Sequence, residues 1–195
     1  MPDKQRCQWV TDDPLYIDYH DNEWGRPVHD DRLLFEMLCL EGAQAGLSWI
    51  TILRRRHHYQ EAFSQFQPEI ISQYNEEDVQ RLLRNDDIIR NERKIRSVIK
   101  NALAFLNVQK EFGSFDKYIW QFVRGRPMIN QWESSADVPA KTKESELMSQ
   151  DLKRHGFSFV GPVICYAFMQ AIGMVNDHTA DCYLSPHTKN EDHLS

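Results

Sequence analysis

The sequence predicts an all-α fold, and three observations indicate it. Apolar residues recur at intervals of three and four, alternation of β-branched with polar residues is scarce, and proline is rare within the periodic segments. The 195 residues are 41% hydrophobic, which is enough for one well-buried core or two closely packed lobes, but not for several independent domains. We therefore expect a single unit over residues 1–184 and a polar tail over residues 185–195.

Residues that favour helix N-termini mark the first helices. Asp13 followed by Pro14 predicts an N-cap with proline in the first turn, and Ser48 has the same capping role before residues 49–53.

A longer helix is expected from Asp30, because one helical face collects Leu33, Leu34, Met37, Leu38, Glu41 and Ala45. Gly46 ends it as a left-handed C-terminal cap. The acid at position 41 therefore lies within an apolar stripe.

The middle of the chain indicates a helical scaffold. Helices are expected over 58–65, 68–73, 76–85 (after an Asn75 cap), 91–112 and 115–123. Residues 125–143 contain glycine, proline and serine and are predicted to be a loop. Two further helices are expected, one over 144–155 closed by Gly156 and one over 162–172 closed by Gly173.

A short hairpin over residues 157–161 joins these last two helices. With glycine at its corners, including Gly161, the backbone amides of the second helix can point outward together, and such amides bind phosphate. Lys153 and Arg154 precede the turn, although basic residues are common near helix C-termini because of the helix dipole.

The charge balance does not favour a histone-like nucleic-acid binder, because the net charge is -6. Basic residues nevertheless cluster over 54–58 and 124–126, so Arg54–Arg56 are candidate phosphate contacts. The alternative is that these runs are solvated helix faces. The longest apolar stretches are shorter than the roughly 20 residues that span a bilayer, and the N-terminus lacks an apolar signal core. We expect a cytoplasmic protein without membrane contact.

Four residues have a pattern typical of a zinc site: Cys7, His20, His178 and Cys182. The last two stand four residues apart, so one helical face or turn can present both. Two sulfur and two nitrogen ligands suit tetrahedral zinc with no position left for water, which favours a structural clamp joining the two termini. The alternative is two free thiols and two ordinary histidines. Cys39 and Cys165 lie in apolar helical patterns and are interpreted as buried small hydrophobes.

Aromatic residues gather in the first fifty residues around Glu41: Trp9, Tyr16, Tyr19, Trp24 and Trp49. Such clusters commonly fill cores. A cage of rings beside a carboxylate, however, suits a purine alkylated at a ring nitrogen, because π faces attract its positive charge and the carboxylate accepts its amine hydrogens. This hypothesis requires a negatively charged Glu41 enclosed by rings around a hollow.

The chain resembles the DNA-3-methyladenine glycosylase I family over nearly its whole length. The resemblance is carried by Cys7-x-Trp9, Asp13-Pro14-Leu15-Tyr16, Tyr19-His20-Asp21-Asn22-Glu23-Trp24-Gly25, Leu40-Glu41-Gly42-x-Gln44-Ala45-Gly46-Leu47-Ser48-Trp49, Gly156-Phe157-x-Phe159-Val160-Gly161 and Asn176-Asp177-His178. It implies a two-lobed helical fold of the helix-hairpin-helix superfamily, with that motif near 144–173, a structural zinc and excision of 3-methyladenine from alkylated double-stranded DNA.

The resemblance also implies roles for single residues. Glu41 and Tyr19 match the groups that hydrogen-bond to the base, Trp49 matches the ring on which it stacks, and Trp9, Tyr16 and Trp24 match further walls of the pocket. The zinc ligands match Cys7, His20, His178 and Cys182. Gly46 and Leu47 lie where the family fills the gap left by the flipped nucleotide.

The expected reaction is cleavage of the N-glycosidic bond by water, with little help from a strong general base, because a cationic base already leaves neutral. The segment after the hairpin offers no obvious catalytic aspartate, since Asp177 lies beside a zinc ligand. No lysine is an evident Schiff-base nucleophile, so we expect a monofunctional, monomeric enzyme. The alternatives are a non-catalytic binder of alkylated bases and a zinc-dependent hydrolase, which four protein ligands would disfavour.

Overall fold

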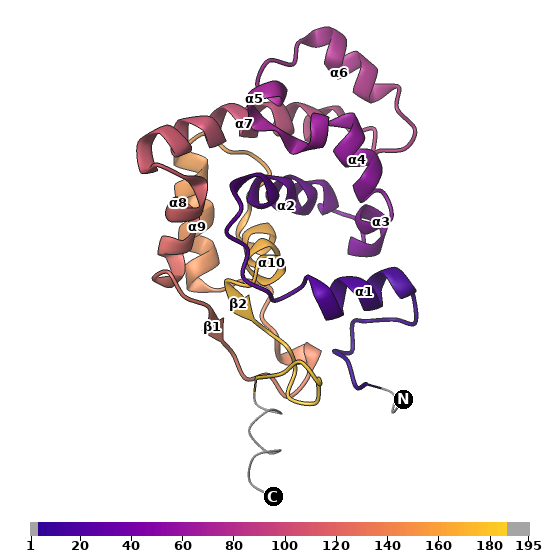
Figure 1. Ribbon diagram of the computed structural model, residues 1–195, viewed down its shortest axis with the longest axis vertical. Coiled ribbons are helices and arrows are strands. Elements are labelled where there is room, and N and C mark those ends of the chain that lie inside the picture. Colours follow the sequence, from indigo (N-terminus) through magenta and orange to yellow (C-terminus); the bar gives the residue numbers. More distant parts are fainter. Residues whose placement is uncertain (1–3, 187–195) are drawn as a thin grey trace, which may run out of the picture.

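Helices form most of the regular structure, as predicted. The computed structural model describes residues 4–186, and Figure 1 shows their arrangement. The α-helices are α1 (Pro14–Asn22), α2 (Asp31–Gln44), α3 (Trp49–Leu53), α4 (Arg56–Ala62), α5 (Pro68–Ile71), α6 (Glu76–Leu83), α7 (Glu92–Phe112), α8 (Phe115–Trp120), α9 (Lys143–Arg154) and α10 (Pro162–Ala171). Three single 3₁₀ turns, η1 (Ser64–Phe66), η2 (Gln121–Val123) and η3 (Ser135–Asp137), and two strands, β1 (Met128–Ile129) and β2 (Val175–Asn176), complete the described elements.

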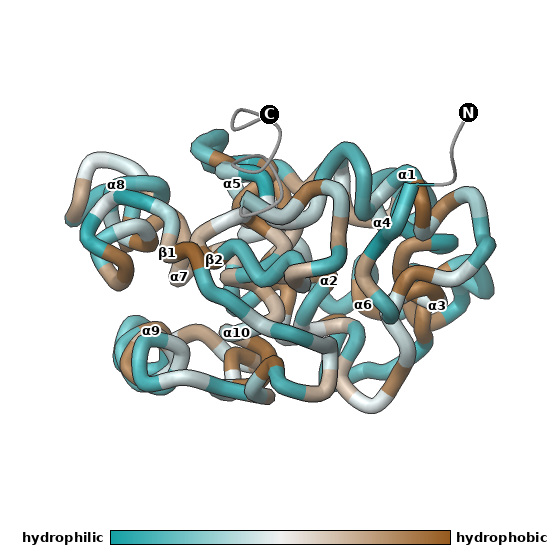
Figure 2. Tube along the Cα trace, turned by 90° about the horizontal axis from the view of Figure 1, so that it is seen from below, coloured by the Kyte–Doolittle hydropathy of each residue, from teal (hydrophilic) through white to brown (hydrophobic). Residues whose placement is uncertain are grey.

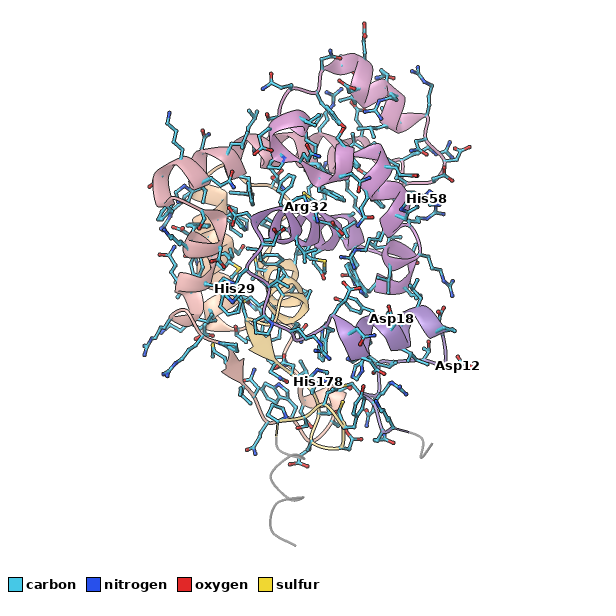
Figure 3. The ribbon with its side chains drawn as sticks, viewed as in Figure 1. Asp12, Asp18, His29, Arg32, His58 and His178 are labelled. Carbon is cyan, nitrogen blue, oxygen red and sulfur yellow. The ribbon has the colours of Figure 1, made fainter. Side chains whose placement is uncertain are left out.

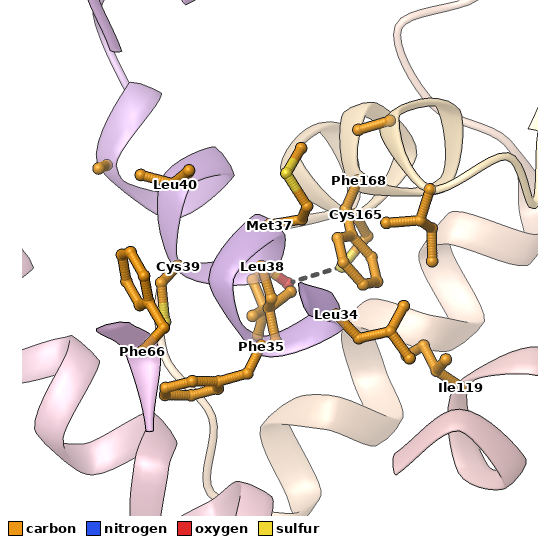
Figure 4. Packing of buried hydrophobic residues seen from close by; sticks show 14 of the residues in the cluster. Leu34, Phe35, Met37, Leu38, Cys39, Leu40, Phe66, Ile119, Cys165 and Phe168 are labelled. Atoms are coloured by element: carbon orange, nitrogen blue, oxygen red, sulfur yellow. Dashed lines mark hydrogen bonds between the residues drawn. The ribbon is translucent and has the colours of Figure 1, made fainter. Parts of the chain in front are cut away.

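Helix α2 lies at the centre of the molecule (Figure 1). Every residue from Leu34 to Ala43 is buried, and α2 contacts α3, α7, α8 and α10. Figure 4 shows its apolar side chains packed against Phe66, Ile119, Cys165 and Phe168. A helix that is covered on all sides carries even its polar residues into the interior, so Glu41 in the last turn is buried by the fold itself.

Two of the predicted caps are confirmed and one differs. The Asp13 carboxylate accepts a hydrogen bond from Leu15 N at 2.9 Å, and Asn75 forms a capping box with Asp78. Ser48 has the extended backbone of an N-cap, but its Oγ is hydrogen-bonded to the Thr51 hydroxyl at 2.7 Å instead of a backbone amide.

The structure differs from the predicted elements in two places. The helix predicted over 58–65 ends at Ala62, because Ser64, Gln65 and Phe66 all have positive φ. The predicted loop over 125–143 contains β1, which pairs in parallel with β2. Strands of two residues are too short to show alternation in the sequence.

The two ends of the described chain lie together (Figure 1). Tyr183 N donates a hydrogen bond to Gln5 O at 2.9 Å, and Val28 N donates to Ile172 O at 3.1 Å. At Gly173 φ is +69°, and a Cβ there would lie 2.3 Å from Arg26 C, so only glycine allows this close approach. The tail predicted over 185–195 falls mainly outside the described residues; Ser185 itself is buried.

Helices α9 and α10 run beside each other, as Figure 2 shows, and the hairpin between them packs on α2. Asn101 of α7 holds the hairpin by accepting from Ser158 N at 2.8 Å and donating to Ser158 O at 3.0 Å. A Cβ at Gly42 would lie 3.3 Å from Phe159 Cβ. The hairpin is therefore seated directly on the turn of α2 that carries Glu41.

Candidate functional site

The structure brings the predicted aromatic cluster and Glu41 together around one cavity of about 230 Å³. Its walls are Trp9, Tyr16, Tyr19, Trp24, Glu41, Gln44, Trp49, Ala167 and Gln170. Helices α1, α2, α3 and α10 each contribute, with Trp9 and Trp24 from the loops on either side of α1. Pockets for drug-sized ligands typically have roughly 300–1,000 Å³, so this cavity suits one small planar molecule.

The rings meet edge to face and leave the hollow open. Trp9 contacts Tyr16 at a centroid distance of 5.4 Å and an interplanar angle of 76°, and Trp24 at 5.1 Å and 70°. Tyr19 and Trp49 lie 5.5 Å apart at 48°. The edge-to-face contacts of Trp9 and the tilted contact of Tyr19 with Trp49 orient these rings against one another in the free protein.

Glu41 is enclosed, as predicted, and its burial changes its ionisation in the free protein. The residue is 4% exposed, and its Oε2 has no hydrogen-bond partner among the described residues. Burial raises the pKa of the Glu41 carboxyl to about 8. Burial therefore favours the neutral acid in the free protein, because none of the described residues offers a donor or a cation that offsets the lost hydration. The negative charge expected at this position when a cationic base is bound stays a prediction.

Tyr19 faces the same cavity as a neutral phenol. It is 3% exposed, and burial together with the nearby Glu41 raises the pKa of its hydroxyl well above the ordinary value. A neutral hydroxyl can donate or accept a hydrogen bond, whereas a phenolate could only accept. Trp49 adds a second buried group without a partner, its indole Nε1–H.

Arg56 links the C-terminal end of α1 to α2 through two carboxylates. Its Nε donates to Glu36 at 2.7 Å, and its Nη1 donates to Glu23. Arg54 pairs with Asp13, and Arg55 donates to the backbone carbonyl of Asp87 at 2.9 Å. The run over 54–56 therefore makes contacts within the protein, which favours the structural interpretation over phosphate contact.

Gly46 and Leu47 lie in the chain between Gln44 and Trp49, which both line the cavity, and the sequence did not reveal the residue that holds the preceding turn. Gly46 has φ +80°, and Leu47 is 38% exposed. The Lys94 ammonium donates to the carbonyls of Ala43 at 2.8 Å and Ala45 at 2.6 Å. A lysine that caps a helix C-terminus from another helix has no signature in sequence spacing.

Gly161 is the N-cap of α10, and no side chain caps that helix end. Its first-turn amides are consequently available to a ligand, as the sequence predicts for phosphate. Lys153 and Arg154 are exposed on the preceding helix. Arg124 and Arg126 line a separate open cavity of about 610 Å³.

The four predicted metal ligands converge at the chain ends. The ligand atoms of Cys7, His20, His178 and Cys182 all lie within 4.8 Å of one another, and all four residues are buried. The sulfur atom of Cys182 is 3.5 Å from His20 Nε2 and 3.4 Å from His178 Nδ1. Hydrogen bonding to Cys182 lowers the pKa of the Cys7 thiol, which favours the thiolate that binds metal.

Polar side chains outside the cluster hold one of its histidines in place. The Asp21 carboxylate lies 2.8 Å from His20 Nδ1 and is paired with Arg6 at 2.7 Å. Such a carboxylate fixes the ring so that Nε2 faces the sulfur atom of Cys182. His178, labelled in Figure 3, also packs against Trp24 at a centroid distance of 4.8 Å, so the cluster supports one wall of the cavity.

Cys39 and Cys165 are buried small hydrophobes, as predicted. Burial raises the pKa of the Cys165 thiol to about 12, and its Sγ donates to Val160 O at 3.4 Å (Figure 4). Neither belongs to the metal cluster.

Comparison with known proteins agrees with this geometry. The family model for methyladenine glycosylase matches residues 9–185. The chain belongs to the methyladenine glycosylase family. It is 48% identical to DNA-3-methyladenine glycosylase 1 of Escherichia coli, over 95% of this chain and 99% of that protein. It is 46% identical to DNA-3-methyladenine glycosylase of Haemophilus influenzae, over 91% and 96%.

Solved structures of the methyladenine glycosylase family share the fold. A crystal structure of 3-methyladenine DNA glycosylase I has a TM-score of 0.92 and 53% identity, covering 93% of this chain and 100% of that one. The Staphylococcus aureus enzyme, whose structure concerns 3-methyladenine recognition, has a TM-score of 0.90 and 38% identity, covering 93% and 96%. A variant solved in complex with 3-methyladenine also has a TM-score of 0.90, with 37% identity, covering 93% and 97%.

Asp177 is held in a buried network of hydrogen bonds. It is 2% exposed and accepts hydrogen bonds from Asn130, Trp132, Tyr166 and Gln170 at 2.6–2.8 Å. These four donors hold the carboxylate in one orientation. The expectation that this segment supplies no catalytic aspartate stays a prediction. Among residues 4–186, no helix is long and apolar enough to cross a membrane.

The raised pKa of Glu41 makes a prediction about stability. The unfolded chain ionises this group near pH 4.5 and the folded chain near pH 8, so the wild type loses stability as pH rises between these values. At about 1.4 kcal/mol per pH unit, the loss is about 4 kcal/mol between pH 5 and 8. Glu41→Gln removes this pH-dependent loss. In urea unfolding, the free energy of unfolding of the variant should therefore rise relative to that of the wild type as pH increases.

The control is Glu77→Gln, at an exposed acid, whose free energy of unfolding should change with pH as that of the wild type does. The same pH dependence in Glu41→Gln and the wild type would contradict the assignment.

Proposed function

We propose that this protein is a monofunctional DNA repair glycosylase that hydrolyses the N-glycosidic bond of 3-methyladenine in alkylated DNA. Two relatives that match nearly the whole chain carry this activity in their names, and one similar structure holds 3-methyladenine. The observation that carries the proposal is the buried carboxyl of Glu41, with one oxygen lacking a partner, inside a cage of rings.

The cage selects a cationic purine. When N3-methylated adenine is attached to the sugar, its ring carries a positive charge, which aromatic faces attract. That charge lowers the pKa of Glu41, so the acid ionises as the base enters and pairs with it. Neutral adenine brings no charge and would leave the desolvated acid uncompensated, which disfavours it.

Bond cleavage follows from the same charge. The bond between C1′ of the sugar and N9 of the base breaks, its electron pair neutralises the ring, and water adds to C1′ and loses a proton. Trp49 stacks on the base and Tyr19 hydrogen-bonds to it. The released base is neutral, so its attraction to the Glu41 carboxylate falls and product can leave.

The α9–hairpin–α10 unit is the proposed helix-hairpin-helix element that contacts the DNA backbone. Its support is the uncapped N-terminus of α10 at Gly161, preceded by exposed basic residues. Leu47, exposed beside Gly46 in the chain between Gln44 and Trp49, suits the gap left by the flipped nucleotide. The two-lobed arrangement, the monomeric state and the cytoplasmic location stay predictions from the sequence.

Zinc is the metal that best fits the Cys7, His20, His178 and Cys182 cluster. Two sulfur and two nitrogen donors that are buried, mutually close and backed by Asp21 make a closed tetrahedral set. When bound, zinc would cross-link the N-terminal loop to the C-terminal turn and take no part in the reaction. This arrangement disfavours the zinc-dependent hydrolase.

Excision itself is tested with methylated duplex DNA. We expect the protein to release free 3-methyladenine, detected by chromatography, and Glu41→Gln to be slower by about 100-fold, as for loss of one buried charged partner. Glu77→Gln serves as the control and should match the wild type. Borohydride should trap no covalent complex with DNA. Binding without any released base would instead support the non-catalytic alternative.

Metal content is tested separately. We expect about one zinc per chain in the purified protein, as for a closed four-ligand site. Cys7→Ser and His178→Asn should lose the metal and unfold at lower temperature, because both chain ends are released. His29→Asn, at a histidine 56% exposed in its side chain, is the control. Full metal content in the two ligand variants would contradict the assignment.

A further inference from the structure

The side-chain amide of Gln170, in α10, is held in one orientation by a hydrogen bond to Asp177. Its Nε2 donates to Asp177 Oδ2 at 2.8 Å, and its backbone carbonyl accepts from Gly25 N at 3.0 Å. Asp177 is buried and held by three other donors, from Asn130, Trp132 and Tyr166. Because a carboxylate only accepts hydrogen bonds, turning the amide over would bring oxygen against oxygen. The amide therefore presents its oxygen away from Asp177.

This oxygen is available at the wall of the cavity. Within residues 4–186, no donor is hydrogen-bonded to Oε1 of Gln170, and the atom is not among the sealed buried polar atoms. Gln170 lines the cavity around Glu41 and also a neighbouring cavity of about 280 Å³ that shares Trp9, Trp24 and Ala167. Apart from the ring residues, the polar side chains on the first cavity are Glu41, Gln44 and Gln170.

A planar base stacked on the rings must present its edges to these side chains. If the Oε1 atom of Gln170 has a fixed direction, it accepts a hydrogen bond from an amine group of the base that faces it. A carbonyl oxygen of the base in the same place would be repelled. Adenine-type bases have an amine at position 6, whereas guanine-type bases have a carbonyl there.

We propose that Gln170 is a specificity-determining residue, whose Oε1 accepts a hydrogen bond from the base and favours 3-methyladenine over 3-methylguanine. Asp177 is the positioning residue that fixes the amide. This inference rests on the proposed function and adds the preference between the two methylated purines. It also gives the buried Asp177 network a role beyond packing beside the metal cluster.

The test uses the full chain and duplex DNA that contains both methylated bases, with the release of each measured over time. In Gln170→Met the acceptor is lost at similar volume, so the ratio of 3-methyladenine to 3-methylguanine excision rates should fall about tenfold, as for one hydrogen bond. The matched control is Gln109→Met, which removes an amide donor to a partly buried carboxylate, Asp31 at 2.7 Å, away from the cavity. Its ratio should equal that of the wild type.

The outcomes separate this inference from the proposed function. If Gln170→Met slows both bases equally, Gln170 has only a structural role and the inference is overturned, although the protein remains a glycosylase. If the wild type releases neither base, the proposed function itself fails. Gln170→Leu provides a second variant should the first not fold, as judged by its melting temperature, and the same fall in the ratio is expected.

Discussion

The constraint on which the site depends is the burial of the Glu41 carboxyl group, whose Oε2 finds no partner within residues 4–186. Leaving such a group unsatisfied costs about 1–3 kcal/mol, and ionising it costs more. The fold sustains this because α2 is buried from Leu34 to Ala43 and anchored by Lys94 and Arg56. Under the proposed function, the energy missing in the free protein is recovered when a cationic ring enters, so the same feature would provide both selectivity and a gain on binding.

The rest of the molecule holds the cavity around that group. The hairpin between α9 and α10 rests on Gly42, next to Glu41, and is pinned by Asn101. The proposed zinc ligands support the opposite wall, because His178 packs on Trp24. The hairpin proposed to contact DNA and the proposed metal cluster are thus each joined to the cavity by direct packing.

Much of the fold and the site could be predicted from the sequence because the signals are local. The cap at Asp13, the long helix ended by Phe112 and the turn at Gly156 follow from neighbouring residues. The two-residue strands and the positive φ values after Ala62 leave no periodic trace.

The composition of the site was predictable, whereas its electrostatics was not. Aromatic residues around Glu41 are visible in the sequence, but the absence of a donor to its Oε2 depends on the complete packing of α2. Lys94 and Gln170 were missed for the same reason, since each acts across helices far apart in the chain. Spacing identifies ligands on one turn, as for His178 and Cys182, but not partners set by tertiary contact.

The most direct measurement is the titration of Glu41 itself. It is followed by NMR through the chemical shift of the side-chain carboxyl carbon in protein labelled with ¹³C-glutamate, and the signal is assigned by its loss in Glu41→Gln. The account predicts a midpoint near pH 8 in the free protein. A midpoint near the ordinary value for glutamate, about 4.3, would show that water or a donor reaches the group and would contradict the account.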